Sequence, residues 1–188
     1  AIPHDANCTK GHMFLPNSPK GSPLSNEAYA KSRARWEPLI EVTQIKGDSE
    51  THPVLSPTDE FADFERWSWS DKDKDRQYEY ARSALKLGLK QNAYIGVNPF
   101  KFGMIGSTDS HTSLSAVEES NFFGEVTEPS KYRIKANLDI FGSSFNAAGY
   151  AAIWAEENTR ESLFAAMKRK EIYASTGPRM TVRFFGGW

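Results

Sequence analysis

The sequence predicts an α/β fold, because a strand, a polar loop and a helix follow one another several times along the chain. Histidine and acidic side chains recur in these polar loops, close to the ends of the predicted strands. In α/β folds the loops at the carboxyl ends of strands carry the chemistry. The order of elements therefore predicts a functional site that several of these loops share.

Composition predicts a single domain over residues 1–188. The formal net charge is −1, hydrophobic residues make up 39% and charged residues 25%, which suits a folded domain with a substantial core. A charge so near zero argues against a nucleic-acid binder. The longest apolar stretch, residues 147–155, is too short to cross a membrane. Cys8 is the sole cysteine, which excludes an intrachain disulfide and a cysteine-rich zinc site, and leaves cytoplasmic and periplasmic locations open.

The first elements follow a loop rich in Gly, Pro, Asn and Ser that begins after His4. Good helix formers predict a helix over Glu27–Trp36, which Pro38 ends. The β-branched run Leu39–Ile45 predicts a strand, and Lys46–Pro53 follows it as a polar loop.

Two helices and a strand are predicted next. Ser56 resembles an N-cap, and aromatic residues at near-helical spacing predict a helix with a core-facing side over residues 57–67. A second helix is predicted over residues 78–87, with Gly88 as the glycine that follows its end. The apolar run Phe100–Ile105 predicts a short buried strand.

The last part of the chain is predicted to return to alternating strands and helices after an insertion or lid at residues 113–149. Asn158 is the expected N-cap of a helix over residues 159–170, whose last turn is basic. Three strands are predicted here: Tyr150–Ala155, a further buried strand, and residues 172–175 and 180–185.

Asp109 and His111 follow the predicted strand Phe100–Ile105 directly. Residues two apart on an extended backbone point to the same side, so this carboxylate and imidazole form half of a divalent metal site. His4 is a third candidate ligand. The alternative is that Asp109 begins a turn and that both histidines are surface residues.

Glu50 and His52 share the same spacing in another polar loop. They are candidates for metal ligands, for a general acid/base pair, or for ordinary loop residues. Lys101 is a candidate contact for an anionic substrate, with a solvated surface lysine as the alternative reading.

With these residues in view, the chain resembles a bacterial family labelled domain-of-unknown-function family 3604. That family lies within the polymerase-and-histidinol-phosphatase (PHP) superfamily of metal-dependent hydrolases. The segments that carry the family resemblance are Pro3-His4, Glu41–Pro53, Pro57–Trp67, Asn98–Thr112, Trp154–Tyr173 and Thr176–Trp188. The segments that resemble superfamily motifs are Thr108–His111, similar to its last Asp-x-His motif, and Pro3-His4, similar to its middle histidine motif.

The resemblance implies a distorted seven-stranded β/α barrel with two or more divalent ions, and it implies His4, Asp109 and His111 as ligands. The chain departs from the superfamily because no two of its four histidines form the opening His-x-His motif. A complete β/α barrel also needs about 250 residues. We therefore expect the C-terminal part of a longer barrel, with a partner in the missing N-terminal part or in a second copy of the chain.

The expected function is hydrolysis of a phosphoester in a small anionic substrate by metal-activated water. Nitrogen and oxygen ligands without thiolate suit Mn²⁺, Zn²⁺ or Fe²⁺. His52 would protonate the leaving group and Glu50 would orient it. The alternatives are metal-dependent amide or lactone hydrolysis, and a non-catalytic structural or ligand-binding module with a partial metal site.

Overall fold

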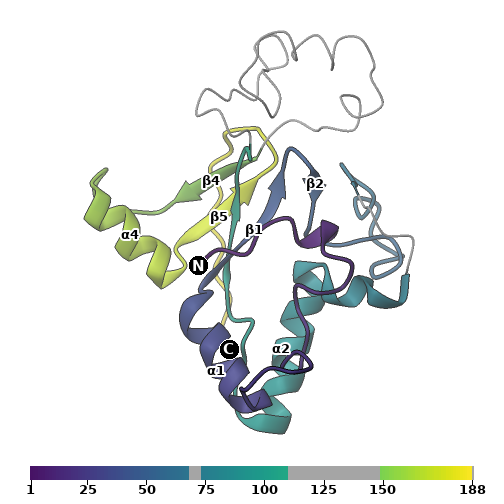
Figure 1. The fold of residues 1–188 in the computed structure, drawn as a ribbon. Coiled ribbons are helices and arrows are strands. Elements are labelled where there is room, and N and C mark those ends of the chain that lie inside the picture. The colour runs from purple at the N-terminus through teal and green to yellow at the C-terminus, as the bar shows by residue number, and fades with distance from the viewer. Residues whose placement is uncertain (68–72, 110–148, 188) are drawn as a thin grey trace, which may run out of the picture.

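The computed structural model describes residues 1–67, 73–109 and 149–187 (Figure 1). These residues form a mixed α/β fold, which confirms the predicted α/β class, while the distorted seven-stranded barrel stays a prediction. Their strands make two small sheets and no closed barrel. The elements are η1 (Ala6–Cys8), α1 (Asn26–Trp36), β1 (Leu39–Gln44), β2 (Gly47–Asp48), η2 (Asp73–Tyr78), α2 (Ala81–Ile95), β3 (Gly103–Gly106), β4 (Tyr150–Ile153), α4 (Arg160–Arg169) and β5 (Ile172–Ser175).

The larger sheet contains the strands β2, β1 and β3 in that order. β1 and β3 run parallel, with Leu39 beside Gly103 and Thr43 beside Gly106. A parallel pair needs a long crossover connection, and α2 is part of the connection between β1 and β3. The carboxyl ends of β1 and β3 therefore meet at one edge of the sheet.

The N-terminal segment runs alongside β1, although it is not itself a strand. Three hydrogen bonds connect this segment to residues 36–44 in the same order along both. Ala1 N donates to Trp36 O at 2.5 Å, Glu41 N donates to Pro3 O at 3.0 Å, and Gln44 Nε2 donates to Asp5 Oδ1. Because the contacts advance in the same direction on both segments, the segments are parallel. His4 and Asp5 thus reach the same edge as the carboxyl end of β1.

One face of β1 packs on α2 and on the N-terminal loop. Ile40 and Val42 belong to this core together with Ala81 and Ala84 of α2. Side chains of a strand alternate between its two faces, so Glu41, between Ile40 and Val42, points away from the core. In Figure 1, α1 and α2 lie below the strands.

The second sheet pairs β4 with β5, antiparallel, and Figure 1 shows α4 beside it. It adjoins β3, because a side chain at Gly106 would come within 2.7 Å of Tyr150 O and 2.9 Å of Ser175 O. The strand predicted over Tyr150–Ala155 is present but is only half-buried. No helix in the described ranges is both long and apolar enough to cross a membrane.

The helix predicted over residues 57–67 is wrong. The chain forms successive tight turns there, in which Asp59 N bonds Ser56 O and Ala62 N bonds Asp59 O. The Asp59 carboxylate accepts from Phe61 N at 3.0 Å and from Arg82 Nη1 at 2.5 Å, which fixes a turn in place of a helix. Phe61 is 71% exposed, so it is not a core residue.

The predicted end of the second helix is also wrong, because α2 continues through Gly88 to Ile95. A side chain at Gly88 would come within 2.1 Å of Asn98 Oδ1, so this glycine permits close packing inside the helix. The αL residue at the end of α2 is Gly96, with φ 71°.

Two predictions near the end of the chain need correction. Thr159, and not Asn158, caps α4, since its side chain accepts from Ser162 N at 3.3 Å. Residues 180–185 form no strand. Their backbone bonds the Tyr173 hydroxyl instead, which donates to Met180 O at 2.6 Å. The predicted insertion at residues 113–149 lies outside the described residues, apart from Gly149.

Candidate metal centre

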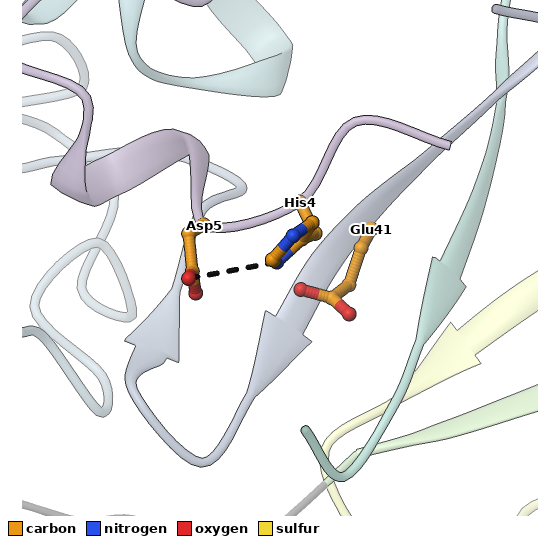
Figure 2. A group of neighbouring side chains, drawn as sticks. All are labelled: His4, Asp5 and Glu41. Atoms are coloured by element: carbon orange, nitrogen blue, oxygen red, sulfur yellow. Dashed lines mark ion pairs between the residues drawn. The ribbon is translucent and has the colours of Figure 1, made fainter. Parts of the chain in front are cut away.

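Three potential ligand atoms gather where the N-terminal segment meets β1 (Figure 2). One atom each from His4, Asp5 and Glu41 lie within 4.8 Å of one another. Figure 2 shows the His4 imidazole between the carboxylates of Asp5 and Glu41. His4 Nδ1 lies 3.5 Å from Asp5 Oδ2. Their position follows from the parallel pairing of the N-terminal segment with β1.

Glu41 is the most buried member of this group. It is 6% exposed, and Ser107 Oγ, just beyond β3, donates to its Oε2. Its other oxygen, Oε1, is buried and has no hydrogen-bond partner among the described residues. Burial raises the pKa of Glu41, whereas hydrogen bonds from Ser107 and Gln44 and the neighbouring His4 lower it in part. A buried carboxylate oxygen without a partner is costly unless a cation or donor reaches it.

A second group of polar residues adjoins the first through Asp5. Gln44 Nε2 donates to Asp109 Oδ2 at 3.1 Å and also to Asp5 Oδ1. Lys46 Nζ is paired with Asp109 and lies 3.8 Å from Asp5 Oδ2. The structure thus brings His4 and Asp109, far apart in the sequence, into one polar neighbourhood with Asp5 at its centre.

Asp5 and Asp109 both take the left-handed backbone conformation, with φ 54° and 47°. This conformation costs most L-residues about 1–2 kcal/mol, although Asp tolerates it better than most. Such backbone positions cluster at functional sites, where the surrounding structure holds them in place. Two of the acidic residues in this neighbourhood share this property.

Comparison with known families identifies the chain. The family model described as "Protein of unknown function (DUF3604)" matches residues 1–188. The chain belongs to this family. No curated protein matches the chain, and no solved structure matches it.

In this DUF3604 chain, a two-residue hairpin loop places Lys46 beside the carboxylates of Asp5 and Asp109. Thr43 pairs with Asp48 and Gln44 with Gly47, which leaves Ile45 and Lys46 as the loop. Ile45 is fully buried, while the Lys46 side chain is 15% exposed. The hairpin therefore anchors the base of Lys46 in the core and its ammonium group among carboxylates.

Gly47 is required for this hairpin. Its φ is 97°, and a side chain there would come within 2.6 Å of Glu65 O and 2.8 Å of Trp67 N. We expect Gly47→Ala to lower the free energy of unfolding by at least about 1 kcal/mol more than Gly21→Ala does. Gly21 is the matched control, because its φ is also positive but nothing lies near it. Equal losses in denaturant unfolding of the two variants would contradict this expectation.

The structure places Glu50 and His52 in a different set of contacts. Glu50 is paired with Arg82 at 2.7 Å. His52 is 4% exposed, its Nε2 lies 3.2 Å from Arg66 Nη1, and its ring packs against Tyr80. Their predicted acid/base role stays a prediction.

The remaining predicted site residues, Lys101 and His111, are not part of the group formed by His4, Asp5 and Glu41 in the described structure. Lys101 is exposed and precedes β3, whereas Ser107 and Asp109 follow it, so Lys101 lies at the opposite end of that strand. His111 lies outside the described residues. The metal-ligand role of His111 and the substrate role of Lys101 stay predictions.

Asp5, Glu41 and Lys46 are site residues that the sequence analysis did not single out. Glu41 carries a signal in the sequence, since it is the one charged residue in the run Leu39–Ile45. A charged residue inside a buried strand needs a partner. Asp5 and Lys46 have no such local signal, because their positions depend on how the N-terminal segment pairs with β1.

Proposed function

We propose that this chain contributes the metal centre of a hydrolase that cleaves phosphoesters, with a divalent ion held by His4, Asp5 and Glu41. The observation that carries this proposal is the buried, unpaired Oε1 of Glu41 within reach of the other two ligand atoms. A divalent cation would supply the partner that this oxygen lacks among the described residues.

The donor set favours an ion of intermediate hardness. One imidazole nitrogen and two carboxylates without thiolate suit Mn²⁺, Zn²⁺ or Fe²⁺. Ser107 donates to Glu41 and so orients that carboxylate, as partners outside the ligand set commonly do. The left-handed backbone at Asp5 and Asp109 supports a site that is held in shape before an ion binds.

The parallel arrangement of segments supports a PHP-like barrel as the parent fold. The N-terminal segment, β1 and β3 run in the same direction. His4 and Asp5 lie towards the carboxyl end of β1, and Glu41 lies in the middle of that strand. Barrel enzymes carry their chemistry at that end of their strands. We infer that this chain forms one portion of such a barrel.

A bound divalent ion would supply a water with its pKa lowered towards about 7 and a Lewis acid for the phosphoryl oxygens. The residues of the chain do the rest. His4, Asp5 and Glu41 would hold the ion. Asp109, which is joined to Asp5 through Gln44, would accept a hydrogen bond from the attacking water. The Lys46 ammonium offsets negative charge where an anionic substrate would approach.

The first test is Mn²⁺ binding, measured by equilibrium dialysis and metal analysis. We expect His4→Ala to weaken binding by at least about 10-fold, since even partners outside the ligand set cost about 10–100-fold when removed. His12→Ala is the matched control, because His12 is an exposed loop histidine. Equal binding by the unaltered protein and both variants would contradict the proposal.

The second test is hydrolysis of a panel of phosphoesters, amides and lactones with added Mn²⁺. We expect phosphoester cleavage that is lost on chelation and in His4→Ala, and kept in His12→Ala. Cleavage confined to amides or lactones would retain the metal centre but overturn the proposed substrate class.

A further inference from the structure

Lys46 places its ammonium group beside the carboxylates of Asp109 and Asp5. Its Nζ is paired with Asp109, lies 3.8 Å from Asp5 Oδ2, and its side chain is 15% exposed. Gln44 fixes this arrangement, since it bonds both carboxylates and accepts from Lys46 N at 2.7 Å. The contacts with Asp109, Asp5 and Gln44 thus fix the position of the ammonium group.

Asp5 lies between the two halves of this site. The same oxygen, Oδ2, lies 3.5 Å from His4 Nδ1 and 3.8 Å from Lys46 Nζ. In two-metal hydrolases two ions about 3.5–4 Å apart share one site. Here the Asp5 oxygen that faces the metal ligand His4 also faces an ammonium, which has no lone pair to offer a metal.

The charge balance also fits one ion. The carboxylates of Asp5, Glu41 and Asp109 are opposed by one ammonium, which leaves two negative charges among these four groups. One divalent ion would neutralise these charges, whereas two ions beside the ammonium would leave two positive charges in excess. Since burying net charge is costly, the described residues favour a single ion.

We propose that the site holds one divalent ion, at His4, Asp5 and Glu41, and that the Lys46 ammonium takes the place of a second. This inference rests on the proposed function, and it departs from the two or more ions that the sequence resemblance implies. Lys46 acts as a positioning residue, because it holds Asp109 and Asp5 in place of a metal ion.

The test compares Mn²⁺ stoichiometry in the unaltered protein, Lys46→Met and Lys46→Arg, by equilibrium dialysis. We expect one Mn²⁺ per chain in the unaltered protein and two in Lys46→Met, because methionine keeps the length of the side chain but removes its charge. Lys46→Arg keeps the charge and should bind one. Lys86→Met, an exposed lysine of α2, is the matched control and should also bind one.

Electron paramagnetic resonance gives an independent readout. A single Mn²⁺ gives an isolated-ion spectrum, whereas two ions that share Asp5 give a spin-coupled spectrum, which we expect in Lys46→Met alone. Two Mn²⁺ in the unaltered protein would overturn this inference and leave the proposed function standing. One Mn²⁺ in Lys46→Met would also overturn it, and no Mn²⁺ in the unaltered protein would overturn both.

Discussion

Glu41→Gln is expected to stabilise the metal-free protein and to weaken its Mn²⁺ binding by about 100-fold. Glutamine keeps the shape of the side chain and the acceptor for Ser107, but it removes a buried charge whose Oε1 has no partner in the described residues. A buried unpaired polar group costs about 1–3 kcal/mol. In a chain of this size, about 1 kcal/mol raises the midpoint of thermal unfolding by roughly 2–4 °C.

The measurement is thermal unfolding at pH 8 in a chelator, followed by Mn²⁺ titration of the same samples. Glu157→Gln is the matched control, because Glu157 is exposed and should change neither quantity. A lower midpoint in Glu41→Gln, together with unchanged Mn²⁺ binding, would mean that Glu41 has a purely structural role. A higher midpoint together with weaker Mn²⁺ binding is the result expected of a metal ligand whose charge is costly to bury without the ion.

The sequence predicted the elements whose signals are local. α1, β1 and β5 appear where helix formers and β-branched runs indicated them. The failure at residues 57–67 has a distant cause, since Arg82 on α2 holds the Asp59 carboxylate. The failure at Gly88 also comes from packing, because Asn98 approaches that glycine closely. Neither contact can be read from a local pattern.

The candidate site was predictable only in part, for the same reason. His4 and Asp109 carry recognisable chemistry near strand ends, and the structure places them in one neighbourhood through Asp5 and Gln44. Lys46 joins them because a tight hairpin turns the chain back at the end of β1. The pairing of three parallel segments decides which side chains meet, and a single sequence does not specify that pairing.

Asp48→Asn is expected to make the stability of the protein less dependent on pH. Asp48 lies in β2, and burial raises its pKa from 3.8 to about 7, although the Glu50 N–H, which donates to Oδ1 at 3.0 Å, opposes the shift. The folded state therefore holds a proton that the unfolded state has lost between these two values. Stability contributed by this group is present below about pH 4, is lost as the pH rises to about 7, and is constant above it.

Asparagine removes this penalty and keeps the acceptor for the Glu50 N–H. At pH 8 we expect Asp48→Asn to exceed the unaltered protein by about 2 kcal/mol in free energy of unfolding, after a discount for partial exposure, and to match it near pH 4. Urea unfolding from pH 4 to 8 measures the difference, with Asp63→Asn as an exposed control. A difference in free energy of unfolding that stays constant with pH would mean that the substitution acts through packing. A difference in free energy of unfolding that grows between pH 4 and 7 would show that ionisation of buried Asp48 destabilises the hairpin that carries Lys46.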